Sequence, residues 1–224
     1  MEIELIDSVF VEASIKDHPV TKKVLQRLKH AKIFEIDRHQ EIFNRRRQNF
    51  RIQKQNPALI LAKKYENFVL DAPSGFGISA QKNYYFSHMY NCIYDCRYCF
   101  LQGMYSSANY VLFVNYEDFF ESIAGIISAN QDTSMTFFSG YDCDSLAFEK
   151  ITGFARKAMD FFSKFNSVEL ELRTKSIVSD IFLKRQSLDN CIIAYSLSPG
   201  GVAEILDHKA PSVMRRISAL KKLA

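Results

Sequence analysis

The stretch from Asn91 to Gln102 reads Asn-Cys-Ile-Tyr-Asp-Cys-Arg-Tyr-Cys-Phe-Leu-Gln and is the most informative part of the chain. It holds three of the five cysteines, Cys92, Cys96 and Cys99, in the spacing C-x3-C-x2-C. Thiolates this close in sequence can bind one iron–sulfur cluster or one metal ion. Three ligands on a four-iron cluster leave one iron free to bind a substrate or cofactor. We therefore expect these cysteines to hold a 4Fe-4S cluster.

A structural zinc site is the alternative interpretation of the same cysteines. Structural zinc takes four ligands in a closed tetrahedron, and His88 would supply the fourth in the spacing H-x3-C-x3-C-x2-C. Such sites usually combine two pairs of closely spaced ligands, and this sequence contains no second pair. A lone histidine at the end of an apolar run is also more often a partly buried side chain than a ligand. The iron–sulfur cluster is the favoured interpretation, and a structural zinc site remains the alternative.

The composition is that of a folded protein of one or two domains. The chain has 224 residues, of which 47% are apolar and 24% charged, so it can build a substantial core. An odd number of cysteines, three of them clustered, argues against a disulfide framework and for a reducing compartment. The N-terminus lacks a signal-peptide pattern, and no apolar run approaches the ~18 residues of a membrane span. We expect a cytoplasmic protein with no membrane partner.

The net charge of +4 is modest, but the basic side chains are unevenly distributed. Interleaved with Phe43 and Phe50, a basic stretch occupies residues 38–64. Its members are Arg38, Arg45, Arg46, Arg47, Arg51, Lys54, Lys63 and Lys64. Such a stretch is suited to lie along a phosphate backbone. The alternative is a solvated helix face, because a run of charge alone identifies no partner.

Residues 1–76 are expected to form a small N-terminal α/β extension that contains this basic stretch. Pro19 near the start of an amphipathic segment predicts a helix to about Ala31. Period-two alternation and compact apolar runs predict strands or a hairpin at 5–14, 32–36, 58–62 and 68–70. A turn-rich segment follows, and we place a domain boundary at residue 76.

Residues 77–224 show a more regular alternation of strands and helices. Strands are expected at 84–90, 133–138, 168–173 and 191–197. Helices are expected at 116–129, with Asn115 as the cap, at 146–163 and 177–184, and from 212. This order indicates parallel βα units. We expect an α/β fold with a partial (β/α) barrel that is truncated after about four βα units, its C-terminal part missing.

Polar and small residues follow each of these strands. The cysteine motif comes after the first, Ser139 to Asp144 after the second, Thr174 and Lys175 after the third, and Ser196 to Gly201 after the fourth. The carboxyl ends of parallel strands meet at one end of a sheet and there form the site. We therefore expect these four loops to converge around the cysteines.

The cysteine motif with Tyr98 before its last cysteine resembles that of the radical S-adenosylmethionine superfamily. The flanking sequence resembles, nearly from end to end, the spore photoproduct lyase family, also described as DNA repair photolyase-like. The segments that carry this resemblance are HPVTKKVLQRL, QKQNPALILA, NCIYDCRYCFLQ, VLFVNYEDFF, ELRTKS, YSLSP and DHKAPSVMRRISALKK. Members of that family use a radical derived from S-adenosylmethionine to split a thymine–thymine lesion in DNA.

The resemblance implies the site residues and the partners. Cys92, Cys96 and Cys99 would bind the 4Fe-4S cluster, with S-adenosyl-L-methionine as the second cofactor. Tyr98 would lie near the adenine, and Lys175 and Ser196 would contact the cofactor from their strand ends. DNA would be the partner, and an external electron donor such as a flavodoxin or ferredoxin would supply the electron. Lys175 is also suited, as a cation, to bind the carboxylate of a ligand. A solvated lysine without a ligand, at the end of a strand, is an equal alternative.

The sequence departs from the family at the reacting centre. The family's hydrogen-donating cysteine aligns with Tyr141, and Cys143 lies two residues later, so either side chain is a candidate for the catalytic role. Phe100 replaces a tyrosine of the lyases. These departures leave two alternatives open, a radical enzyme acting on a non-DNA substrate and a catalytically degenerate nucleic-acid-binding paralogue.

Five further residues near the strand ends have two interpretations each. Cys191 is expected to be a small buried core residue rather than a ligand. Asp142 and Asp144 either position a substrate or cap the following helix. The pair Gly200-Gly201 either lets the backbone approach a ligand or turns the chain.

Overall fold

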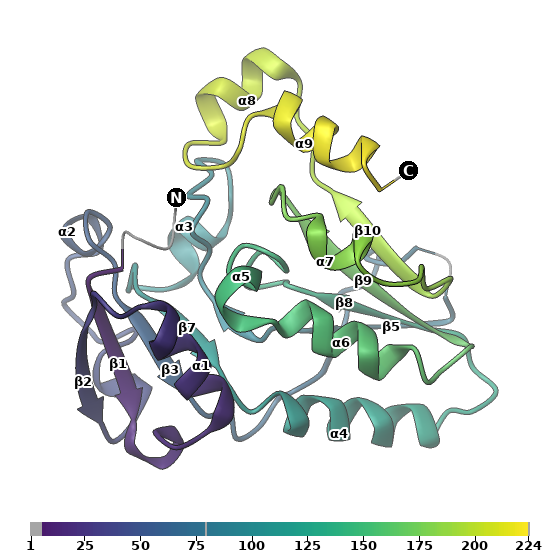
Figure 1. Cartoon of the computed structure of the whole chain (residues 1–224), viewed down its shortest axis with the longest axis horizontal. Coiled ribbons are helices and arrows are strands. Elements are labelled where there is room, and N and C mark those ends of the chain that lie inside the picture. Colours follow the sequence, from purple (N-terminus) through teal and green to yellow (C-terminus); the bar gives the residue numbers. More distant parts are fainter. Residues whose placement is uncertain (1–5, 79, 224) are drawn as a thin grey trace.

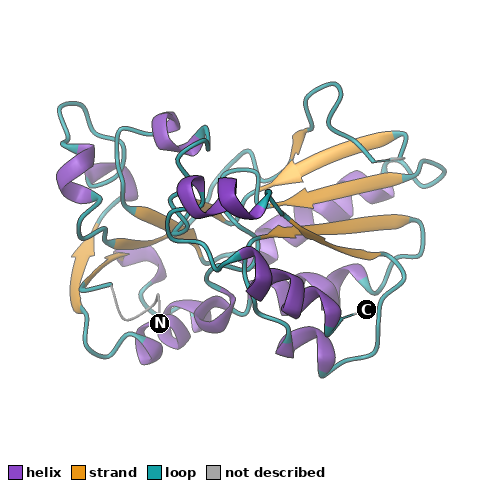
Figure 2. Cartoon of the chain, turned by 90° about the horizontal axis from the view of Figure 1, so that it is seen from above, coloured by secondary structure: helices purple, strands orange, loops and turns teal. Residues whose placement is uncertain are grey.

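The computed structural model describes residues 6–78 and 80–223, which form two five-stranded sheets lying side by side (Figures 1 and 2). The first sheet contains β1 (Ser8–Glu12), β2 (Lys32–Ile36), β3 (Leu59–Ala62), β6 (Met89–Tyr90) and β7 (Tyr110–Phe113) in the order β2-β1-β3-β7-β6. The second contains β4 (Leu70–Asp71), β5 (Lys82–Phe86), β8 (Met135–Ser139), β9 (Val168–Thr174) and β10 (Cys191–Tyr195) in the order β10-β9-β8-β5-β4. The α/β architecture is confirmed, and its closure into a partial barrel stays a prediction.

Most strand pairs are parallel, as the alternation of strands and helices indicates. The exceptions are the short edge strands, because β6 runs antiparallel to β7 and β4 antiparallel to β5. The helices are α1 (Pro19–Arg27), α2 (Phe50–Gln53), α3 (Leu101–Met104), α4 (Tyr116–Ser128), α5 (Glu149–Thr152), α6 (Phe154–Phe162), α7 (Asp180–Leu183), α8 (Gly200–Leu206) and α9 (Val213–Lys221). None of these helices is long and apolar enough to cross a bilayer.

The second sheet has one face covered by helices and one face that carries polar and half-exposed side chains. Tyr84, Phe137 and Leu170 are neighbours across β5, β8 and β9, and Phe137 packs against Phe162 of α6. Because successive side chains of a strand point to opposite faces, the next register row lies on the other face. That row consists of Tyr85, Phe138 and Glu171. Helices α4 and α6 lie together on the covered side (Figure 1).

Two expected elements are each divided in the structure. The strand expected over 84–90 becomes β5 and β6, which belong to different sheets. The helix expected over 146–163 begins only at Glu149 and is broken at Gly153, whose φ of 66° lies in the left-handed region that favours glycine. Asn115 does stand at the start of α4, but its side chain makes no capping bond there. It binds the Lys64 backbone instead, accepting from N–H at 2.9 Å and donating to the carbonyl at 2.8 Å.

Both sheets combine strands from before and after the expected domain boundary at residue 76. β4 lies before the boundary but pairs with β5 in the second sheet, whereas β6 and β7 lie after it and belong to the first sheet. The division into domains stays a prediction, and the two sheets do not follow it. The chain therefore passes from the second sheet to the first between β5 and β6, and the cysteine motif lies in the connection from β6 to β7.

His88 lies in the core at this crossing. Its imidazole is 2% exposed and stacks on Phe154 with ring centroids 3.7 Å apart and nearly parallel planes. Burial lowers the pKa of His88 from 6.5 to about 3. The folded protein therefore keeps this side chain neutral at pH values where the unfolded chain protonates it.

We expect His88 to make the protein less stable as the pH falls below 6.5. From about pH 7 to about pH 5 the unfolded chain binds a proton that the folded state does not, which lowers the free energy of unfolding by about 2 kcal/mol. The measurement is urea unfolding of the wild type and His88→Leu at both pH values. Glu149, whose pKa burial raises to about 7, acts with the opposite sign in both proteins and cancels in the comparison. Equal pH dependence of the two proteins would contradict the prediction.

Candidate active site at the cysteine loop

Two residues of the cysteine loop have the left-handed backbone conformation, with positive φ. Asn91 has φ 64° and Asp95 has φ 52°, and Asn and Asp adopt this conformation more readily than other non-glycine residues. The Asn91 amide donates to the carbonyls of Ser107 at 2.8 Å and Asn109 at 2.7 Å, which fixes the start of the loop. The chain thus reverses immediately before Cys92 and again before Cys96.

The C-terminal part of the chain packs directly against this loop. The Arg97 N–H donates to the Leu206 carbonyl at 2.8 Å, and the Lys209 N–H donates to the Tyr94 carbonyl at 2.9 Å. Asp95 binds His208 at 3.2 Å and also pairs with Lys54, which follows α2. The cysteine loop is therefore held between α2 and the segment after α8.

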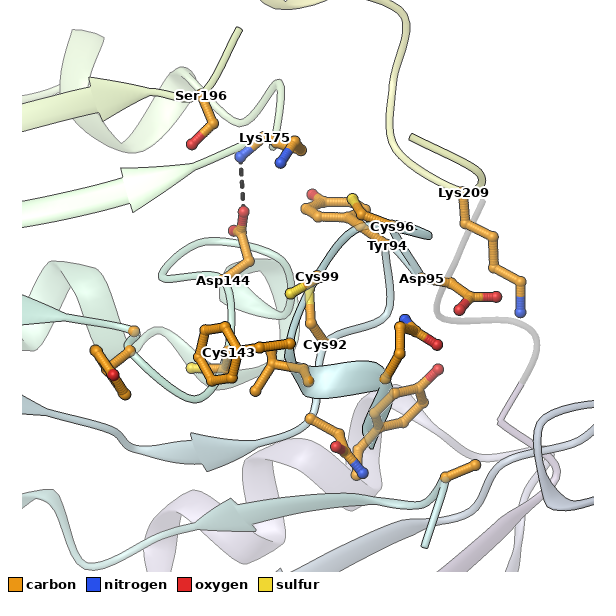
Figure 3. A pocket seen from close by; sticks show the side chains of 18 of the residues that line it. Cys92, Tyr94, Asp95, Cys96, Cys99, Cys143, Asp144, Lys175, Ser196 and Lys209 are labelled. Atoms are coloured by element: carbon orange, nitrogen blue, oxygen red, sulfur yellow. Dashed lines mark hydrogen bonds between the residues drawn. The ribbon is translucent and has the colours of Figure 1, made fainter. Parts of the chain in front are cut away.

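Cys92, Cys96 and Cys99 line one pocket of about 200 Å³. Its other walls include Lys175 at the end of β9 and Ser196 at the end of β10, together with Tyr141, Cys143 and Asp144 from the loop after β8. Figure 3 shows Lys175 and Ser196 at the ends of their strands and Asp144 on a loop, all facing the region of the cysteines. The structure thus brings together the cysteines and the polar side chains that follow β8, β9 and β10.

Lys175 is the main cation beside the cysteines. Its ammonium donates to the Tyr98 hydroxyl at 2.5 Å and lies 3.8 Å from the Asp207 carboxylate. Burial opposes the charge, but the bond to Tyr98 and the neighbouring anions raise the pKa of Lys175 above its ordinary value. Tyr98 is 52% exposed and is the outermost member of this group. Lys175 therefore stays charged where an anionic ligand would enter.

Asp144 fixes the loop after β8, and of the two roles open to Asp142 and Asp144, helix capping and substrate positioning, the second stays a prediction. The Asp144 carboxylate accepts bonds from the Leu146 N–H at 2.9 Å, the Thr174 hydroxyl at 2.7 Å and the Lys175 N–H at 2.6 Å. It thereby ties the loop after β8 to the end of β9. Asp142 is also buried, and burial raises its pKa. Neither carboxylate caps α5, which begins at Glu149.

The cysteine thiols lie in surroundings that favour their neutral form. Burial raises the pKa of Cys96 to about 12 and the pKa of Cys92 well above its ordinary value. Metal ions bind thiolates, so binding here would release protons from these thiols. In residues 6–78 and 80–223, no three His, Cys, Asp or Glu side chains already surround one point as metal ligands.

The two candidates for the hydrogen donor differ in their access to the pocket. Cys143 is only 8% exposed, and burial raises the pKa of its thiol well above the ordinary value. Tyr141 is half-buried, and its ring lies 4.4 Å from Tyr85 and 5.5 Å from Phe100, measured between centroids. Both side chains line the cysteine pocket, and Tyr141 also lines a second pocket beside it.

His88 does not join the cysteines. It lies against Phe154 in the core and is not among the residues that line the cysteine pocket. The zinc alternative therefore loses its expected fourth ligand. Three thiols with an adjacent cation are a donor set that fits a cluster with one iron open to a cofactor.

A sequence model described as spore photoproduct lyase matches residues 5–224. The chain belongs to the spore photoproduct lyase family. That family is part of the radical S-adenosylmethionine superfamily. No curated protein sequence matches the chain.

Solved structures of spore photoproduct lyase have a similar fold. One is a variant with bound AdoMet and dinucleoside spore photoproduct, and another is the lyase complexed with dinucleoside spore photoproduct. Each has a TM-score of 0.84 and 18% sequence identity. Both matches cover 97% of this chain and 64% of the lyase chain. The chain thus spans less than two thirds of the length of these lyases.

The basic stretch of this lyase-family chain is only partly a surface feature. Arg45, Arg46, Arg47 and Arg51 are exposed and form no ion pair with any residue that the structure describes. Lys64 instead lies in the core, 8% exposed, with its ammonium over the rings of Tyr90, Phe113 and Phe119. Phe50 and Lys54 line the cysteine pocket, so the basic stretch reaches its rim.

The sequence analysis did not predict the ion pair between Arg216 and Asp207, which lies beside the cysteine pocket. Arg216 of α9 is 0% exposed, and its guanidinium donates to the Asp207 carboxylate at 2.6 Å and to the Ser196 carbonyl at 2.7 Å. Asp207 in turn faces Lys175 and accepts from the Cys96 thiol. Gly200 and Gly201, for which a ligand contact and a turn were both open, form the start of α8. Cys191 is half-buried and packs against the core.

Proposed function

We propose that this chain is a radical S-adenosylmethionine lyase that starts the repair of a thymine-derived lesion in DNA. Membership of the spore photoproduct lyase family supports this proposal. The observation that carries it is the pocket itself, in which Cys92, Cys96 and Cys99 stand beside Lys175 and Ser196. Three thiolates and a fixed cation are what a cluster-bound, carboxylate-bearing cofactor requires.

The three cysteines would hold the 4Fe-4S cluster, and Lys175 and Ser196 would contact S-adenosylmethionine from the ends of β9 and β10. Together these groups would supply the electron and the radical that start the reaction. Lys175 would bind the carboxylate of the cofactor, because its ammonium stays charged and is positioned by Tyr98 and Asp207. Ser196 would donate or accept a hydrogen bond from the neighbouring strand, and Tyr98 would cover the adenine.

Tyr141 is the better candidate for the hydrogen donor of this reaction. Tyr141 lines both the cysteine pocket and the pocket beside it. Cys143 lines the cysteine pocket but is only 8% exposed. A phenol O–H can give a hydrogen atom to a substrate radical, which leaves a tyrosyl radical. The external electron donor, of the flavodoxin or ferredoxin class, would then return the electron, and water the proton.

The test is anaerobic reconstitution with iron and sulfide, followed by reduction in the presence of S-adenosylmethionine. We expect about four irons per chain, formation of 5′-deoxyadenosine, and conversion of a lesion-bearing oligonucleotide to undamaged thymines. Tyr141→Phe should keep cofactor cleavage but slow repair at least about tenfold, and Cys143→Ala should have a smaller effect. A folded, iron-loaded protein that forms no 5′-deoxyadenosine would overturn the proposal.

A radical enzyme with a different substrate is the second candidate function. The observation that favours it is Tyr141 in place of the family's donor, together with aromatic neighbours Tyr85 and Phe100 around it. Cofactor cleavage without repair of the lesion-bearing strand, and without binding of DNA at low salt, would favour this candidate.

A further inference from the structure

Residues 44–51 form an arginine loop whose charge has no role in the site described above. Arg45, Arg46 and Arg47 are consecutive and exposed, and Arg51, also exposed, follows on α2. None of these side chains forms an ion pair within residues 6–78 and 80–223. In the same part of the chain, only Arg45 makes a side-chain hydrogen bond, donating to the Glu41 carbonyl at 3.2 Å. The arginine loop therefore presents its positive charge to the solvent.

The backbone of the arginine loop is held in an unusual conformation. Asn44 has φ 58° and Arg47 has φ 64°, both in the left-handed region. Asparagine adopts this region readily, whereas an arginine there is strained by its Cβ. The Ser106 N–H donates to the Asn44 side-chain oxygen at 2.7 Å, and the Gln48 amide donates to the Ile42 carbonyl at 2.6 Å. Strain that is fixed by surrounding contacts in this way is concentrated at functional segments.

The arginine loop adjoins the cysteine pocket at both of its ends. Ser106, which binds Asn44, follows α3, the helix that begins shortly after the last cysteine of the motif. At the other end, Phe50 and Lys54 line the cysteine pocket. Lys54 is paired with Asp95, so its charge is neutralised within the chain, unlike that of the arginines. A ligand bound to the arginine loop would therefore lie at the rim of the cysteine pocket.

A solvated helix face, the alternative interpretation of the basic stretch, does not describe these arginines. α2 has only four residues, and Arg45, Arg46 and Arg47 precede it in a loop. Solvated helix faces usually carry both signs of charge, which pair along the helix. The sequence of residues 44–51, NRRRQNFR, contains no acidic residue. The loop thus has the composition and the exposure of an anion-binding segment.

We propose that the arginine loop binds the phosphate backbone of DNA and anchors it beside the cysteine pocket. This inference rests on the proposed function and names the surface that holds its partner. Each guanidinium has a planar fork of N–H donors that matches the oxygens of a phosphate, and consecutive arginines can bind successive phosphates. Such contacts supply affinity and orientation without reading the sequence of the bases.

The test measures the binding of a short, labelled, undamaged DNA duplex by fluorescence anisotropy, with the reconstituted protein and without reductant. The salt concentration is varied over about 50–200 mM. In the triple variant Arg45→Ala, Arg46→Ala, Arg47→Ala, the slope of log K against log salt should become shallower by about 2–3, because up to three phosphate contacts are lost. The affinity at the lowest salt should fall at least about tenfold. Replacing the same three arginines by lysine should keep most of the slope, because the charge remains.

The matched control removes the same charge elsewhere on the surface, by replacing Arg215, Lys221 and Lys222 with alanine. All three are exposed and lie on α9 or directly after it. This control should bind DNA with the slope of the wild type. The variant without the loop arginines should also keep its iron and its formation of 5′-deoxyadenosine, because Arg45, Arg46 and Arg47 do not line the cysteine pocket.

The outcomes separate this inference from the proposed function. An unchanged slope in the alanine variant of the loop, an equal loss in the α9 control, or no binding of DNA by the wild type would overturn the inference. Formation of 5′-deoxyadenosine together with DNA binding that does not depend on the loop arginines would refute the inference alone. Arginine-dependent binding of DNA by a protein that forms no 5′-deoxyadenosine would refute the proposed function alone.

Discussion

Arg216→Met is expected to lower the free energy of unfolding by about 3–5 kcal/mol, because it leaves a buried carboxylate without its partner. The guanidinium is 0% exposed and binds Asp207, the Ser196 carbonyl and the Pro211 carbonyl, the last at 2.9 Å. Methionine fills a similar volume but donates no hydrogen bond, so all three acceptors lose the partner that the buried guanidinium supplies. Urea unfolding of both proteins measures the difference.

Arg215 provides the matched control, since it is the neighbouring residue on α9 and is exposed. Arg215→Met should change the free energy of unfolding by less than about 0.5 kcal/mol. Arg216→Lys should fall between the two, because lysine keeps the charge but lacks the planar fork that reaches several acceptors at once. Equal stability of Arg216→Met and Arg215→Met would show that the Asp207 pair contributes nothing.

The same ion pair also lies beside the candidate site. Asp207 lies between Arg216 and Lys175 and also accepts from the Cys96 thiol. Without the Arg216 guanidinium, the Asp207 carboxylate would attract the Lys175 ammonium more strongly and draw it away from the pocket. We therefore expect Arg216→Met to weaken S-adenosylmethionine binding even at temperatures where the protein stays folded.

Local sequence patterns predicted the parts of this site that depend on short-range spacing. The three cysteines share one pocket because they lie within eight residues of one another, and a loop of that length reverses easily at Asn91 and Asp95. Lys175 and Ser196 reach the same pocket because the carboxyl ends of neighbouring parallel strands meet. Periodicity found most strands for the same reason, since the alternation of side chains is a local property.

Features that depend on long-range pairing escaped prediction. Nothing in the local pattern distinguishes buried Arg216 from exposed Arg215, or buried Lys64 from exposed Arg51. The division of one expected strand into β5 and β6 likewise depends on their partners, which are β8 in one sheet and β7 in the other. Burial of a charge is decided by residues more distant in the sequence, such as the Ser196 carbonyl for Arg216 and the rings of Tyr90, Phe113 and Phe119 for Lys64.

Replacing any one of Cys92, Cys96 and Cys99 by alanine is expected to abolish cluster binding. Each cysteine lines the pocket, and a four-iron cluster held by only two thiolates would not survive purification. After anaerobic reconstitution, these variants should contain no iron above background, lack the broad visible absorption and form no 5′-deoxyadenosine. The iron content and the absorption spectrum are read before any assay of activity.

Cys143→Ala and Cys191→Ala are the matched controls, and both should retain about four irons per chain. Cys143 is the stricter of the two, because it lines the same pocket as the three loop cysteines, whereas Cys191 does not. Loss of iron in Cys143→Ala would mean that a fourth thiolate closes the cluster, which would leave no iron for the cofactor. One equivalent of colourless zinc in the wild type would point to a structural site instead. Full iron in both controls, and none in the three loop variants, is the pattern that a cluster with one open iron requires.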